Sequence, residues 1–135
     1  MKVNYALACD LAVRAASGKL NVAGILNELH SDEYPFVREQ VSVVVGFQAS
    51  VAEVGQEKQI RVALHGPDGA EIAAIERDYT VSQPTYIGRP RFVNSAWDFL
   101  GVEFTAPGDY AFHVLVNGDE KATVPLYVYA PIRLS

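Results

Sequence analysis

Cysteine is nearly absent from this sequence: Cys9 is the only one among 135 residues. A single thiol cannot form an internal disulfide, which excludes the small secreted scaffolds whose folds depend on several cystines. Only eight residues precede Cys9, fewer than the charged and apolar regions of a secretion or lipoprotein signal occupy together. We therefore expect a cytoplasmic protein.

Long apolar runs and blocks of like charge are missing as well. Asp10 and Arg14 interrupt the apolar N-terminal stretch, far short of the roughly 20 residues that cross a bilayer. The net charge is −5, whereas nucleic acids and anionic membranes are bound through a basic surface. The sequence therefore predicts neither a nucleic acid nor a membrane as a partner.

The stretch Ser17-Gly18-Lys19 contains the Gly-Lys pair of a phosphate-binding loop but lacks the rest of that motif. The motif requires a glycine where Val13 stands and a serine or threonine where Leu20 stands. It also requires a helix after the loop, whereas residues 20–29 carry a strand pattern. We interpret the stretch as the turn of a hairpin.

Clustered metal ligands are not visible either. A metal site needs three or four converging His, Cys or carboxylate ligands, and His30, His65 and His113 lie in separate segments without short spacing. Cys9 alternates with apolar neighbours, which predicts a small buried residue and not an exposed nucleophile. The sequence predicts no metal and no cofactor.

Catalytic motifs are absent from the rest of the chain. No Gly-x-Ser-x-Gly nucleophile motif occurs. Carboxylates that hydrolyse glycosides meet in space from any positions, and Asp98 and Glu103 lie in one aromatic-rich segment. They fall on opposite parities of that segment, which disfavours a shared site on one face. We expect a protein that is not an enzyme, with a hydrolase as the least favoured reading.

What the sequence does contain is alternation of apolar and polar residues with a period of two. In the first fifteen residues one parity holds Val3, Tyr5, Leu7, Cys9, Leu11 and Val13. This period is typical of half-buried strands, so we expect that set to be buried. Strand patterns follow at 20–29, 41–49, 59–65, 71–82, 92–104, 110–116 and 122–128. The sequence predicts about eight strands.

Turn signals separate these segments. Gly66-Pro67-Asp68-Gly69 and Asn117-Gly118 are typical hairpin turns, and Gly55 can close a helical turn. Short strands joined by tight turns predict one domain over 1–135. Tyr110 opens a strand just after a Pro-Gly turn, as a tyrosine does at the sheet corner of immunoglobulin-like domains. We predict an antiparallel, immunoglobulin-like β-sandwich, with a jelly roll as the alternative.

Both ends of the chain resemble one known family. The N-terminal "CDLAVRAASGKLNVAGIL" joins a Cys-Asp-x-Ala strand to a Gly-Lys-Leu-Asn turn and a Gly-Ile, and "PGDYAFHVLVNGDEKATVPLYV" forms a C-terminal hairpin. Both stretches are similar to a bacterial family of small all-β proteins of unknown function. The resemblance implies a β-sandwich-like fold in a bacterial protein and brings no reaction, cofactor or catalytic residue.

Large apolar residues occupy both faces of the last predicted strands. Trp97 and Phe99 share their parity with Val93 and Ser95 and fall opposite to Phe92, Leu100, Val102 and Phe104, and Tyr127 and Tyr129 fall opposite to Val124, Leu126 and Val128. Either loops cover this outer face or it is an interface. Contiguous exposed aromatics mark protein contacts, and sandwich edges invite strand pairing between subunits. We favour protein–protein association, most simply a homo-oligomer, through these four residues or an edge strand.

The longest irregular segment supports an alternative function. Arg89 and Arg91 flank a proline, and Tyr86 lies nearby. Two guanidiniums beside aromatic rings on a rigid loop can hold a carboxylate or a phosphate. The alternative hypothesis is a module that binds a small ligand, an anion or a carbohydrate through the loops 30–36 and 83–91.

Overall fold

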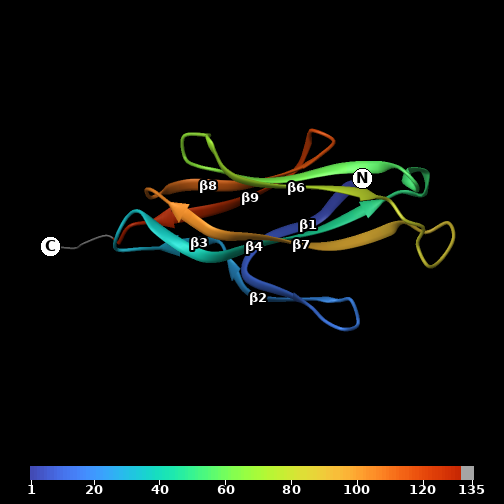
Figure 1. Ribbon diagram of the computed structural model, residues 1–135, viewed down its shortest axis with the longest axis horizontal. Coiled ribbons are helices and arrows are strands. Elements are labelled where there is room, and N and C mark those ends of the chain that lie inside the picture. Colours follow the sequence, from blue (N-terminus) through green and yellow to red (C-terminus); the bar gives the residue numbers. More distant parts are fainter. Residues whose placement is uncertain (132–135) are drawn as a thin grey trace.

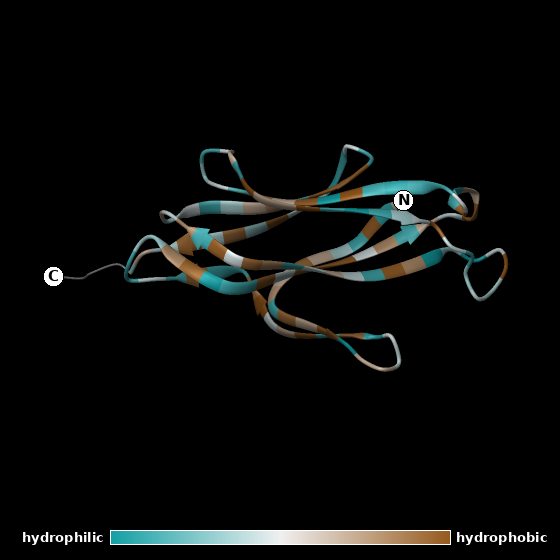
Figure 2. Ribbon diagram, in the orientation of Figure 1, coloured by the Kyte–Doolittle hydropathy of each residue, from teal (hydrophilic) through white to brown (hydrophobic). Residues whose placement is uncertain are grey.

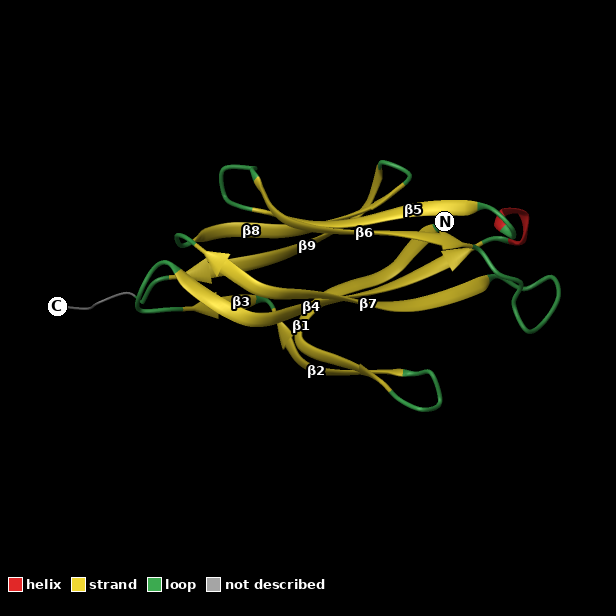
Figure 3. Ribbon diagram, viewed as in Figure 1, coloured by secondary structure: helices red, strands yellow, loops and turns green. Residues whose placement is uncertain are grey.

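Two facing β-sheets form the described part of the molecule, residues 1–131 of a computed structural model (Figure 1). The first sheet has the strand order β2-β1-β4-β7 and the second has the order β3-β9-β8-β5-β6. The elements are β1 (Lys2–Arg14), β2 (Leu20–Leu26), β3 (Glu28–His30), β4 (Phe36–Ala49), the short 3-10 helix η1 (Val51–Glu53), β5 (Glu57–His65), β6 (Glu71–Thr80), β7 (Arg91–Phe104), β8 (Gly108–Val116) and β9 (Asp119–Tyr129). The predicted all-β sandwich is confirmed, and the one helix among residues 1–131 is the short η1 (red in Figure 3). Within residues 1–131, no helix has the length and apolar composition that a bilayer crossing demands.

The predicted turns form as expected. Asn117 and Gly118 have φ values of 50° and 82°, and two positive values match the right-handed twist of the flanking strands. The turn at 66–69 is closed by a hydrogen bond of 2.9 Å from the Gly69 N–H to the Gly66 carbonyl. Residues 17–19 lie in the hairpin turn between β1 and β2, so the hairpin interpretation of this stretch is confirmed.

Nine strands form in residues 1–131, one more than expected, because the predicted strand over 20–29 divides at Asn27. β2 pairs antiparallel with β1, whereas β3 pairs parallel with β9 in the other sheet. The Asn27 carbonyl accepts a hydrogen bond of 3.0 Å from the Tyr127 N–H at this crossing. The described sandwich is therefore antiparallel except between β3 and β9.

The core lies between the sheets and consists of aromatic and β-branched side chains. Its buried members include Val41, Val43, Val45, Phe47, Val62, Leu64, Trp97, Phe99, Phe104, Phe112, Val114 and Leu126. Tyr110 is also buried, and its hydroxyl donates to the Ala106 carbonyl at 2.6 Å. This is the bond expected of a tyrosine at a sheet corner. The choice between immunoglobulin-like and jelly-roll topology stays a prediction.

The prediction of which face of β1 is buried is wrong for part of the strand. Cys9 is fully buried as expected, but Tyr5, Leu11 and Val13 are 40%, 44% and 51% exposed. The pairing register with β4 shifts between Val3 and Tyr5, and such a shift moves the following side chains to the other face. The residues beyond Asp10 then leave the sandwich altogether.

The distal parts of β1 and β2 form an arm, defined here as residues 10–26. Beyond Asp10, β1 pairs with β2 and no longer with β4, and the arm runs below β4 and β7 in the view of Figure 1. Asp10 forms an ion pair with Arg38 of β4 at the base of the arm. Near the tip, Arg14 donates to the carbonyl of Asn94 in β7 at 2.7 Å. Both ends of the arm are therefore tied to the first sheet.

The arm covers part of the outer face of this sheet. Ser42 and Val44 of β4 do not belong to the core between the sheets, yet they are 0% and 1% exposed. β2 contacts β7 although the two strands are not neighbours in the sheet. Gly24 permits the bend because its φ is +69° and a Cβ there would lie 2.1 Å from Asp10 Oδ2. A hairpin thus covers an outer face for which we expected loops or an interface.

Candidate functional site

Trp97 and Phe99, two of the four predicted interface residues, lie in the core. Their side chains are 2% and 3% exposed and belong to the cluster between the sheets. The inward face of β7 changes parity around Gly101, whose φ is +61°. Trp97 and Phe99 point inward before this glycine and Val102 points inward after it. The prediction that the two aromatic residues lie on the outer face is therefore wrong. Odd-numbered residues of β7 face the core before Gly101, and even-numbered residues face it after Gly101.

Two polar contacts hold the Trp97 ring. Its Nε1 donates to Ser95 Oγ at 2.9 Å, and Ser95 Oγ donates in turn to the Val45 carbonyl at 3.0 Å. The Arg77 guanidinium carbon lies 4.3 Å from the ring centroid, which is a cation–π contact. The cavity beside the ring holds about 130 Å³, too little for a drug-sized ligand. The role that this geometry supports for Trp97 is stabilisation.

Tyr127 and Tyr129, the other two predicted interface residues, are partly exposed on β9. Their exposed fractions are 40% and 41%. The Tyr34 hydroxyl donates to the Tyr129 carbonyl at 2.7 Å, and the His30 ring lies 5.4 Å from the Tyr129 ring. The four predicted residues do not form one surface, and a contact made by the two tyrosines alone stays a prediction.

Exposed apolar side chains gather on the strands of the first sheet, most densely on the arm. Those more than a third exposed in this sheet are Tyr5, Leu11, Val13, Val22, Ile25, Val37, Phe92 and Leu100. The second sheet has three, Ile72, Tyr127 and Tyr129. Figure 2 shows hydrophobic residues (brown) on both strands of the arm. The register places Leu11, Val13 and Ile25 on one face of it, a surface that the alternation assigned to the interior.

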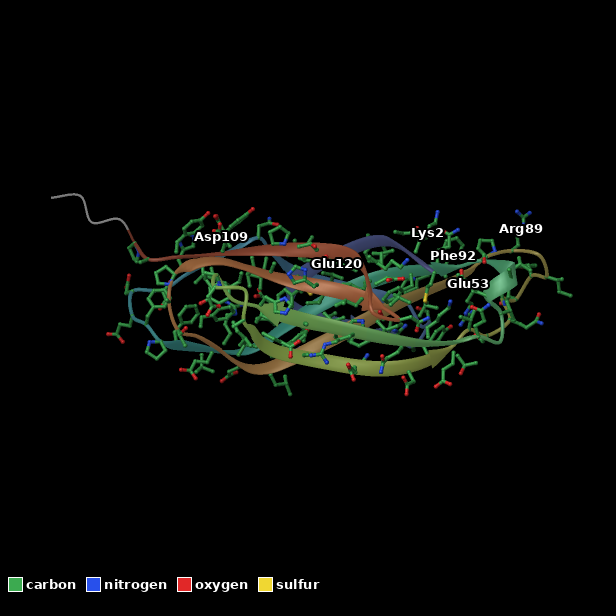
Figure 4. All side chains as sticks on the ribbon, turned by 90° about the horizontal axis from the view of Figure 1, so that it is seen from above. Lys2, Glu53, Arg89, Phe92, Asp109 and Glu120 are labelled. Carbon is green, nitrogen blue, oxygen red and sulfur yellow. The ribbon has the colours of Figure 1, made fainter. Side chains whose placement is uncertain are left out.

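The three predicted anion-binding residues surround one pocket. Tyr86, Arg89 and Arg91 line a cavity of about 430 Å³ together with Pro84, Thr85, Pro90 and Phe92. Figure 4 shows Arg89 and Phe92 at the same end of the molecule. Burial raises the pKa of the nearby Tyr79 phenol, but the Arg91 guanidinium and Ser82 beside it outweigh burial, so the pKa is lowered.

The loop 30–36 does not contribute to this pocket. It follows β3 at the end of the sandwich opposite to the segment 83–91 (Figure 1). Its side chains are engaged locally, because Tyr34 packs edge-on against Phe36 with ring centroids 5.3 Å apart. The prediction that both loops serve one ligand site is wrong, since the length of the sandwich separates them.

Two of the three histidines meet on the outer face of the second sheet. The rings of His65 and His113 lie 4.7 Å apart because β5 and β8 are paired. Glu120 bonds to His113 Nδ1 and accepts a bond of 2.7 Å from Thr123 Oγ1. His113, followed by Thr123, lowers the pKa of the Glu120 carboxyl. Within residues 1–131 no group of three or more His, Cys, Asp or Glu side chains converges as metal ligands.

Neither the cysteine nor the carboxylate pair has the geometry of a catalytic group. Cys9 is fully buried, and burial and the nearby carboxylates raise the pKa of its thiol, although a backbone hydrogen bond from Leu11 opposes this shift. Asp98 accepts a bond of 2.6 Å from Ser42. Glu103 lies five residues farther along β7, roughly 17 Å at the rise of a strand. Glycosidase carboxylates are about 5–9.5 Å apart.

Glu53 joins two positive groups near the start of the chain. Its carboxylate lies 2.8 Å from Lys58 Nζ and also pairs with the Met1 amino group, and it accepts a bond of 2.9 Å from the Ser50 N–H. Lys58, the amino group and Ser50, in that order, hold the pKa of Glu53 well below its ordinary value. The carboxylate oxygens of Glu53 are engaged by the Met1 amino group, Lys58 Nζ and the Ser50 N–H, so the role that this geometry supports for the cluster is stabilisation.

The geometry defines a two-sheet β-sandwich domain with a projecting hairpin arm. Residues 4–129 match the model of a family of unknown function, DUF6941, and the chain belongs to that family. Membership in a family of unknown function is thereby confirmed, while the bacterial origin and the quoted N-terminal motif stay predictions. No curated protein matches the sequence.

Proposed function

We propose that this protein is a non-enzymatic association module that pairs with a second copy of itself through the free edge of β2. The observation that supports this proposal is the composition of β2, Leu-Asn-Val-Ala-Gly-Ile-Leu, which has no charged residue and no proline. β2 pairs only with β1, so its other edge presents unused backbone donors and acceptors. Soluble proteins guard such edges with charge, proline or shortness.

The other three edges of the described sheets are guarded. β3 has only three residues and includes Glu28. β6 carries Glu71, Glu76, Arg77 and Asp78, and β7 carries Arg91, Asp98 and Glu103. Like charges repel a second copy laid along these edges, and strongly hydrated side chains oppose burial. Only the arm offers an edge without either obstacle among residues 1–131.

Charge distribution favours the same face for self-association. The elements of the first sheet, with the turn 15–19 and the segment 81–90, contain six basic and four acidic residues. The remaining described residues contain four basic and twelve acidic ones. Two copies that met through the second sheet would bring together two strongly acidic surfaces. Contact through the first sheet avoids this repulsion.

The outward side chains of the arm supply the apolar area that edge pairing alone lacks. Ile25 and Val13 are 62% and 51% exposed and share a face with Leu11. Antiparallel pairing of two β2 strands would bring the outward side chains of the two copies side by side across the new strand pair, so that they bury part of their exposed area against one another. A catalytic role is not needed for this function. We also propose a cytoplasmic location and a bacterial source, which rest on the cysteine content and the family resemblance.

Light scattering coupled to gel filtration tests the proposal. The wild-type chain at about 100 μM should elute with the mass of a dimer, because an unguarded strand edge pairs with a second copy. Ile25→Lys places a charge on the arm and should give a monomer with an unchanged circular dichroism spectrum. Ile72→Lys is the matched control, since Ile72 is 41% exposed on the edge strand of the other sheet, and should remain dimeric. A monomeric wild type, or the same mass for all three proteins, would refute the proposal.

A further inference from the structure

The pocket formed by residues 84–92 has the size and position of a ligand site. Its volume of about 430 Å³ falls within the range of small-molecule pockets. It lies at the end of the sandwich, before β7, and is separate from the free edge of β2. Its lining combines two guanidiniums with two aromatic rings and two prolines.

The two arginines of this pocket have no protein anion to neutralise them. Within residues 1–131, neither Arg89 nor Arg91 forms an ion pair, and the Arg91 guanidinium lies beside the Tyr79 phenol. The other described arginines are engaged: Arg38 by Asp10, Arg61 by Glu71 and Glu76, Arg77 by the Trp97 ring, and Arg14 by backbone carbonyls. The chain has a net charge of −5, so two neighbouring guanidiniums without an ion-pair partner form a local concentration of positive charge.

Arg91, which lines the pocket, carries an unpartnered polar atom, and Tyr79 beside it carries another. Arg91 Nε and the Tyr79 phenol oxygen are both buried without a hydrogen-bond partner. A buried donor without a partner is destabilising, and such atoms are rare in native proteins. A bound oxyanion that accepts from the Arg91 fork removes part of this deficit.

The backbone around the pocket is held in place at both ends. Before it, Val81 is buried and exchanges backbone bonds of 2.8 and 2.9 Å with Gly55 and Gln56. After it, Arg91 is paired with Ala49 in the first sheet. Pro84 and Pro90 restrict the segment between these anchors. The pocket is therefore anchored to the sandwich on both sides in the sequence.

We propose that this pocket binds an oxyanion, a carboxylate or phosphate group, attached to an apolar or aromatic body. The planar guanidinium of arginine presents paired N–H donors that match the two oxygens of either group. Phe92 and Tyr86, 56% and 75% exposed, offer the surface for the apolar body. Lys2 lies two strands from Phe92 through the pairs Lys2–Gln48 and Gln48–Phe92, and Figure 4 shows Lys2 at the same end as Arg89. A longer anion would find a third positive charge there.

Titration calorimetry and amide NMR shifts test the site with four probes: inorganic phosphate, phenyl phosphate, benzoate and the uncharged benzyl alcohol. We expect phenyl phosphate or benzoate to bind with a dissociation constant below about 1 mM and benzyl alcohol not to bind. The ratio of the phosphate and carboxylate affinities then identifies the natural group. Shifts should concentrate on residues 84–92.

Arg89→Gln should weaken binding at least tenfold, and Arg89→Lys should weaken it less because the charge remains. Arg91→Gln should act in the same direction, with its fold verified by circular dichroism because Arg91 also contacts Tyr79. Lys19→Gln is the matched control: it removes one positive charge from the exposed hairpin turn and should leave the affinity unchanged. No binding of any anion at 10 mM, or an equal loss in Lys19→Gln, would overturn the proposal.

Discussion

Replacement of Trp97 by alanine tests whether this residue is a core element or a surface anchor. The side chain is 2% exposed, and truncation of such a tryptophan costs about 3–5 kcal/mol of unfolding free energy. The cation–π contact with Arg77 at 4.3 Å adds about 0.5–1 kcal/mol. We expect a loss of about 4 kcal/mol, which at about 3.5 °C per kcal/mol for a chain of this length lowers the melting temperature by about 14 °C.

Guanidinium denaturation followed by far-ultraviolet circular dichroism is the appropriate assay, because Trp97 is the only tryptophan and its substitution removes the fluorescence signal. Trp97→Phe keeps most of the ring and should cost about 1–2 kcal/mol, so it reports on the site if the alanine variant does not fold. Phe92→Ala is the matched control from the same strand, with a ring 56% exposed, and should cost less than 1 kcal/mol. A loss below 1 kcal/mol for Trp97→Ala, or an equal loss for Phe92→Ala, would show that the described packing is wrong.

Two further substitutions test the first sheet and the Glu53 cluster. In Gly46→Ala the added carbon would lie 2.0 Å from Tyr5 Cε1, so the Tyr5 ring must move and lose the 2.7 Å hydrogen bond of its hydroxyl to Asn94 Oδ1. Thermal unfolding should show a loss of about 1 kcal/mol in unfolding free energy. This loss should vanish when the same substitution is made in a Tyr5→Ala background. Glu53→Gln should lower the unfolding free energy by about 2 kcal/mol at pH 7, because Lys58 loses a charged partner. The folded-state pKa of Glu53 is depressed below its ordinary 4.5. The stability that the Glu53 carboxylate contributes is therefore complete above about pH 5 and is lost as the pH falls. Denaturation curves of the variant and the wild type should converge in acid. A difference that persists unchanged at pH 3 would contradict the ion-pair assignment.

The sequence was sufficient for features that depend on neighbouring residues. Positive φ at Asn117 and Gly118 follows from the only residue types that tolerate it in a two-residue turn, and the Tyr110 bond spans just four residues to Ala106. The alternation in β4, β8 and β9 likewise identified which side chains fill the core. Each of these inferences needed no knowledge of how distant strands pair.

The errors arose where a strand changes face or where the partner strand matters. A period of two assigns faces only up to the next irregularity, and the register shift after Val3 and the change of inward parity around Gly101 invert the assignment beyond them. For this reason the predictions for Trp97 and for the arm were wrong. The contact between His65 and His113 has a different cause, because it requires the pairing of β5 with β8, which residue spacing does not encode. The residues that line the pocket at 84–92 could be grouped from sequence because they all lie in one short segment.

The covered outer face of β4 has a consequence for how the chain is made. Residues 41–47, Val-Ser-Val-Val-Val-Gly-Phe, are all buried and have the uncharged, β-branched composition of segments that form amyloid-like zippers. The segments that shield this stretch from below, β1 and the arm, precede it in the sequence, so they leave the ribosome first. Synthesis from the N-terminus thus provides the cover of the outward side chains, Ser42 and Val44, before this stretch itself is made, whereas the strands that cover its inward side chains follow it.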